Sequence, residues 1–70
     1  MMQESFTYHI KLQDAVDEEV FNTSSPLSVK VAQADAETTT FIVHTDQSGL
    51  IGLIRYLHYQ GFMILALART

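Results

Sequence analysis

The fold is decided by the stretch TTTFIVHTDQSGLIGLIRYLHYQGFMILALA, which runs from Thr38 to Ala68. Its first part, Thr38 to Thr45, is rich in β-branched residues and predicts a strand. The middle part predicts an amphipathic helix, because it carries apolar residues at helical spacing, namely Leu50, Leu53, Ile54 and Leu57. Gly61 follows at the position where a left-handed residue commonly ends a helix. The final part, Phe62 to Ala68, is apolar throughout and predicts a strand that is central in the sheet or buried on both faces.

The first half of the chain adds two strands and a short helix. Phe6 to Leu12 alternates apolar and polar residues, which is the period of a half-buried strand. Leu27 to Gln33 alternates again and is expected to pair with Thr38 to Thr45 as a hairpin. Between the first two strands, Gln13 to Asn22 favours a short helix capped by Asp14. An irregular acidic loop is the alternative for that segment, because its β-branched and Asp content is poor for a helix.

The predicted order is strand, helix, strand, strand, helix, strand, within a single domain that spans residues 1–70. Two helices on one face of a four-stranded antiparallel sheet form a two-layer α+β sandwich of the ferredoxin-like βαββαβ type. If the segment from Gln13 to Asn22 is not helical, the order becomes β-β-β-α-β and the fold class stays α+β.

Composition excludes several classes of function. The chain has no Cys, so it can form neither disulfides nor thiolate metal sites. Its net charge is −4, and its cations are scattered, so we expect no nucleic-acid partner. Those cations are Lys11, Lys30, Arg55 and Arg69. No apolar run is long enough to span a membrane, and the amino-terminal residues do not read as a secretory signal. We therefore expect a soluble cytoplasmic protein with no membrane partner.

The polar turn before the long helix consists of Asp46, Gln47, Ser48 and Gly49. A helix amino-terminus presents unpaired N–H groups and a partial positive charge, which suits a small anionic ligand or a carboxylate. Gly49 would let such a ligand approach the backbone closely. The alternative is that Asp46 or Ser48 simply caps the helix, which stabilises it by about 1 kcal/mol.

The run Asp46-Gln47-Ser48-Gly49-Leu50-Ile51, between a strand and an apolar helix, resembles the D-x-x-G-L-[LI] turn of ACT domains. The resemblance covers about residues 39–68 and implies a regulatory module that senses an amino acid or a similar small ligand. It also implies that the ligand lies at Asp46 and Gly49, that Leu50, Ile51 and Ile54 pack the helix, and that two copies dimerise side by side. ACT domains carry this unit as their first βαβ, whereas here it is the last.

A second hypothesis concerns the outer face of the same helix. Gly52, Arg55, Tyr56 and Tyr59 fall opposite the apolar stripe. Tyr and Arg are enriched at protein interfaces, and Gly52 would allow another surface to approach closely. The chain is therefore expected to form a homo-oligomer, most simply a dimer, with this face and the final strand as contacts. A protein-interaction or structural domain is the alternative to ligand sensing.

No catalytic or metal site is predicted. His9 and His44 lie on strands that could pair, whereas His58 has no partner at helical spacing, so no metal ligands converge. The acidic cluster Asp14, Asp17, Glu18 and Glu19 lacks the spacing of a calcium loop. We interpret it as a solvated face, with an acidic docking patch for a basic partner as the alternative. We expect a protein that is not an enzyme and has no cofactor.

Overall fold

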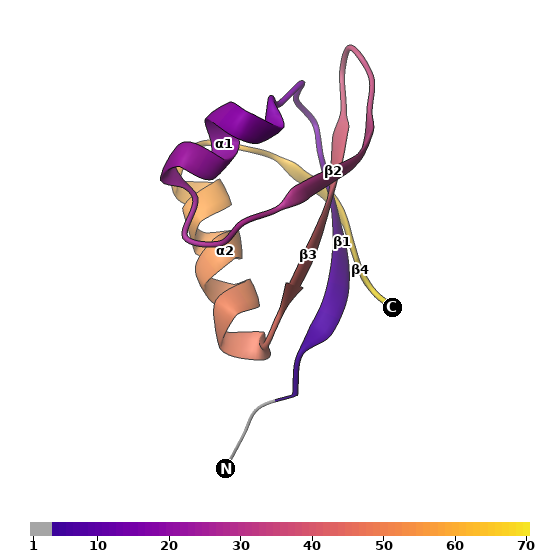
Figure 1. Ribbon diagram of the computed structural model, residues 1–70. Coiled ribbons are helices and arrows are strands. Elements are labelled where there is room, and N and C mark those ends of the chain that lie inside the picture. The colour runs from indigo at the N-terminus through magenta and orange to yellow at the C-terminus, as the bar shows by residue number, and fades with distance from the viewer. Residues whose placement is uncertain (1–3) are drawn as a thin grey trace.

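The computed structural model describes residues 4–70. Residues 1–3, which belong to the amino-terminal stretch where no secretory signal is expected, lie outside the described part. The elements are β1 (Phe6–Leu12), α1 (Glu18–Ser24), β2 (Lys30–Ala34), β3 (Thr39–Thr45), α2 (Gln47–Tyr59) and β4 (Ile64–Arg69). Both helices lie on the same side of one four-stranded sheet (Figure 1). The predicted α+β class, with an antiparallel sheet and two helices, is confirmed, and the order that lacks the first helix does not occur.

The strands are arranged in the order β2-β3-β1-β4, and all neighbours are antiparallel. β1 therefore pairs on both sides, with Tyr8 opposite Val43 of β3 and also opposite Arg69 of β4. Alternate residues of β1 and β3 point towards the helices and form the core with one stripe of α2, with Phe21 of α1 and with Val29. The core residues are Tyr8, Ile10, Leu12, Phe21, Val29, Phe41, Val43, Leu50, Leu53 and Leu57. Neither of the helices described lies on the opposite face of the sheet (Figure 1).

Helix α1 begins later than the sequence predicted. Asp17, not Asp14, is the N-cap, and its side chain accepts a hydrogen bond from the Val20 N–H at 3.1 Å. The residues before it are tied to the sheet, because the buried Thr39 hydroxyl donates to the Asp14 carbonyl and accepts from the Val16 N–H. This long-range pair of hydrogen bonds keeps the start of the predicted helix in a loop.

Strand β2 also begins later than predicted, at Lys30. The cause is Asn22 of α1, whose side chain accepts from the Val29 N–H at 2.9 Å and donates to the Val29 carbonyl at 3.0 Å. The Glu18 carboxylate likewise accepts from the Val31 N–H at 3.2 Å. Helix side chains thus take the place of a neighbouring strand along the start of β2.

Both ends of α2 follow the prediction. Asp46 is the N-cap, and Leu50, Leu53 and Leu57 are buried. At the other end Gly61 has φ of +87°, a conformation that only glycine adopts readily. The Phe62 N–H donates to the Leu57 carbonyl at 3.0 Å, as in a Schellman motif. No helix among residues 4–70 is long and apolar enough to cross a membrane.

The prediction for the final strand is wrong. Within residues 4–70, β4 is an edge strand that pairs with β1 alone, so it is neither central in the sheet nor buried on both faces. Of its residues only Ile64 is half-buried, and the others are exposed. A continuous apolar run predicts a strand correctly, but it does not say whether the monomer itself covers that strand.

Candidate functional site

The turn at the start of α2 is held together by its own residues. The Asp46 carboxylate accepts a hydrogen bond from the Gly49 N–H at 2.8 Å, and the Asp46 carbonyl accepts from the Leu50 N–H at 3.0 Å. Gln47 and Ser48 are exposed on the first helical turn. Asp46 thus serves as the helix cap. This is the role expected if the turn does not bind a ligand.

The side chain of Thr45 leaves no room for a Cβ atom at position 49 unless Thr45 moves. A Cβ atom placed on Gly49 would lie 2.0 Å from Oγ1 of Thr45 and 3.2 Å from its Cβ. Its φ is not positive, so the backbone itself could accept another residue. Close packing against Thr45 therefore explains the glycine without a ligand.

The four residues predicted to form the outer face of α2 divide into two groups. Gly52 and Arg55 are exposed, and Tyr59 is 87% exposed. Tyr56 instead turns towards α1, where its ring meets Phe21 edge-on at 5.7 Å and its hydroxyl lies 2.8 Å from Oγ of Ser24. The sequence placed Tyr56 on the outer face because the helical spacing alone could not show that α1 packs there.

The open face of the sheet brings two of the three histidines near each other. His9 lies opposite Ile42, and His44 lies opposite Thr7 on the same face. The Thr7 hydroxyl lies 3.2 Å from Nδ1 of His44. Among residues 4–70 no group of three or more His, Cys, Asp or Glu side chains could hold a metal ion.

The outer edge of β4 is unpaired in the part of the chain that the structure describes, although the sequence predicted that this strand would be central or buried on both faces. Met63 is 61% exposed, and Leu65 and Leu67 are each 46% exposed. Arg69 is the one charged residue of the strand, and its guanidinium lies over the Phe6 ring at 4.4 Å. The edge from Ile64 to Ala68 therefore carries no charge. Edge strands are normally protected by charged residues, proline or a covering loop, because their unpaired backbone groups attract other strands.

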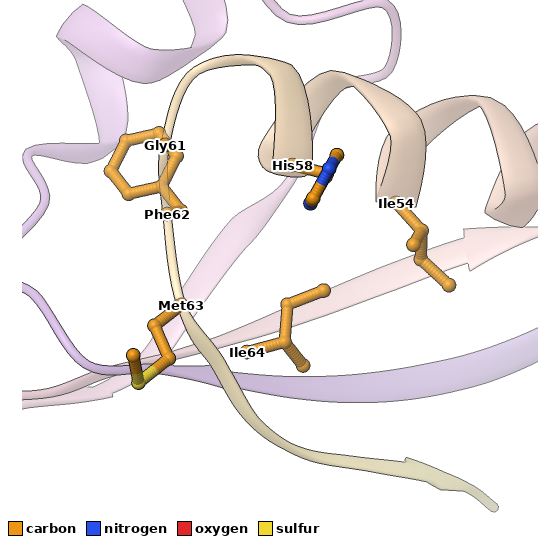
Figure 2. Close-up of a pocket in the computed structure, with 6 residues that line it drawn as sticks. All are labelled: Ile54, His58, Gly61, Phe62, Met63 and Ile64. Carbon is orange, nitrogen blue, oxygen red and sulfur yellow. The ribbon is translucent and has the colours of Figure 1, made fainter.

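The apolar surface continues from β4 onto α2. A shallow hollow of about 520 Å³ lies between them and is lined by Ile54, His58, Gly61, Phe62, Met63 and Ile64. Figure 2 shows Ile54 and His58 projecting from α2 beside Ile64. Ile51, one helical turn before Ile54, is 44% exposed. This Ile51 was expected to pack the helix, yet much of it stays open to solvent.

Comparison of the chain with protein-family models, with curated proteins and with solved structures gave no match. Assignment of a function therefore rests on the geometry described above.

Proposed function

We propose that this chain is a non-catalytic interaction module that forms a homodimer through the free edge of β4. The observation that carries the proposal is the uncharged, exposed edge from Ile64 to Ala68. An apolar edge strand of this kind is a ready template for pairing with another strand. The exposed Leu65 and Leu67 would lose their contact with water in such a pair, which favours association.

A second copy of the chain fits this edge for reasons of symmetry and charge. An antiparallel pair of identical strands is self-complementary, so one patch can serve both subunits of a dimer with two-fold symmetry. The chain carries a net charge of −4, so two copies repel each other over most approaches. The charge-free edge is a region where two copies could meet without placing like charges opposite each other.

The dimer would form one continuous sheet with the helices of both copies on the same face. A two-fold axis perpendicular to the sheet would bring α2 of one copy near α2 of its partner. Ile51 on α2 and Leu67 on β4, each about half-exposed in the single chain, would then lie close to the axis. Burial of about half of a Leu or Ile side chain stabilises by roughly 1 kcal/mol.

The proposal includes the finer fold assignment. In the sheet, β3 lies between β1 and β2, and β1 lies between β3 and β4. Each βαβ unit is thus split by a third strand, an arrangement that supports the ferredoxin-like βαββαβ type. Ligand sensing at the turn of Asp46, Gln47, Ser48 and Gly49, where the resemblance to ACT domains places a ligand at Asp46 and Gly49, stays a prediction. The cytoplasmic location stays a prediction as well.

Sedimentation velocity over a range of protein concentrations tests the dimer. Leu67→Lys places a charge in the proposed interface, whereas Val20→Lys adds the same charge on α1, where Val20 is 68% exposed. We expect the wild type and Val20→Lys to sediment as dimers and Leu67→Lys to dissociate at concentrations roughly tenfold higher or more. A wild-type chain that stays monomeric up to about 0.5 mM would contradict the proposal. Its dimer dissociation constant would then be far above the roughly micromolar value of a specific complex.

A further inference from the structure

A second hollow lies where α1 meets the end of α2, and the proposed dimer does not use it. Its volume is about 350 Å³, within the range of small binding sites. α1 is hydrogen-bonded to β2, the sheet edge opposite β4. The residues that line the hollow are Asp14, Ala15, Val16, Asp17, Val20, Phe21, Ser24, Tyr56, Gln60 and Phe62.

The floor of this hollow is apolar and held in place by packing. The Phe21 ring meets the Tyr56 ring edge-on at 5.7 Å and lies 6.1 Å from the Phe62 ring. The hydrogen bond between Tyr56 and Ser24 joins the two helices beside these rings. A partner side chain could therefore enter a preformed site, so little conformational entropy would be lost on binding.

The rim of the hollow is acidic and is also fixed. The Asp17 carboxylate accepts from the Val20 N–H, and the Asp14 carboxylate accepts from the Ala15 N–H at 2.9 Å. The Asp14 carbonyl is bonded to the Thr39 hydroxyl of β3. Among the residues that the structure describes, no Lys, Arg or His lines the hollow. Two carboxylates thus stand beside an apolar floor without a cation among the lining residues.

Val20 is the apolar side chain at the mouth of the hollow. It is 68% exposed, although it lies on a helix that buries Phe21 next to it. A partner that covers the hollow would bury this side chain, and the burial would favour association.

We infer that this hollow docks a basic segment of a partner protein, which inserts one apolar side chain between Val20 and the aromatic floor. Charge complementarity selects this occupant, because Asp14 and Asp17 attract Lys or Arg and repel acidic segments. The same carboxylates disfavour a nucleic acid, whose phosphates are negative. A second copy of this chain is disfavoured at this rim, unlike at the charge-free edge of β4, because its net charge of −4 would meet Asp14 and Asp17.

The probe is the fluorescein-labelled synthetic peptide KKLFKK, titrated against the full chain by fluorescence polarisation. KKSSKK keeps the charge but lacks the apolar anchor, and EELFEE keeps the anchor but reverses the charge. In the protein, Asp14→Asn with Asp17→Asn removes two charges while Asn preserves the α1 cap. The matched control is Glu4→Gln with Asp46→Asn, which removes two charges beyond the other end of the sheet and also keeps a cap.

We expect saturable binding of KKLFKK, and binding at least fivefold weaker for each altered peptide. The Asp14/Asp17 variant should bind KKLFKK about fivefold more weakly, the effect of two surface ion pairs, and the control less than twofold more weakly. Val20→Lys should weaken the binding of KKLFKK and leave the oligomeric state unchanged. Leu67→Lys should weaken the dimer and leave the binding of KKLFKK unchanged. The inference is overturned if KKLFKK does not bind, if it binds Val20→Lys and Leu67→Lys equally well, or if Val20→Lys changes the oligomeric state.

Discussion

Replacement of Gly49 by alanine tests whether this glycine serves the packing of the turn. In a helix, Gly→Ala normally stabilises by about 0.5–1 kcal/mol, because glycine loses more backbone entropy on folding. Gly52 has open space around it, so Gly52→Ala should show this gain. At Gly49 the new methyl group would lie 2.0 Å from Oγ1 of Thr45, which must move. Overpacking of this kind costs about 1–3 kcal/mol.

The two variants should therefore differ in free energy of unfolding by about 1–3 kcal/mol, with Gly52→Ala the more stable. Urea denaturation followed by circular dichroism, at one protein concentration, measures this difference. Combining each variant with Thr45→Ala should shrink the difference, because Oγ1 is then absent. If Gly49→Ala is as stabilising as Gly52→Ala, the packing explanation fails and a ligand becomes the better reason for the glycine.

Two further perturbations test the loop before α1, which lines the hollow between α1 and the end of α2, and the turn of the hairpin formed by β2 and β3. Thr39→Val removes the buried hydroxyl that donates to the Asp14 carbonyl and accepts from the Val16 N–H. Urea denaturation should show that the free energy of unfolding falls by about 1–3 kcal/mol. A fall of less than about 0.5 kcal/mol would contradict the role of Thr39 as the anchor of that loop. The pKa of Asp35 is held below its ordinary value of 3.8 by hydrogen bonds from the Glu37 and Thr38 N–H groups. The charged carboxylate therefore stabilises the fold above pH 3.8, and this contribution is lost as the pH falls through the lowered pKa. Thermal melts should show the advantage of wild type over Asp35→Asn shrinking as the pH falls below about 4; an advantage that stays constant down to about pH 2 would argue against the hydrogen bonds as its source.

The sequence predicted best the features that neighbouring residues determine. The cap at Asp46 and the left-handed Gly61 depend on a few adjacent backbone groups, so their residue types were sufficient. The buried stripe of α2 follows from helical periodicity, and the alternation of β1 follows from strand periodicity.

The features that the sequence could not predict depend on contacts between distant segments. α1 begins at Glu18 because Thr39, far along the chain, holds the preceding loop. Tyr56 faces α1 because Phe21 and Ser24 lie there, which no helical wheel of α2 contains. Strand propensity does not say which strand occupies the edge of a sheet, so the exposure of β4 appears only in the folded chain.

The proposed dimer can be tested most directly by the distance between identical labels on β4. The chain has no Cys, so Ala66→Cys provides a unique position for a spin label on the exposed part of the strand. A strand rises about 3.4 Å per residue, so labels within three residues of the two-fold axis lie within about 20 Å of each other. Pulsed electron paramagnetic resonance should show this short distance, and adding Leu67→Lys should abolish it. A label at Ala66 that shows no intermolecular distance, at concentrations where the chain sediments as a dimer, would contradict pairing through β4.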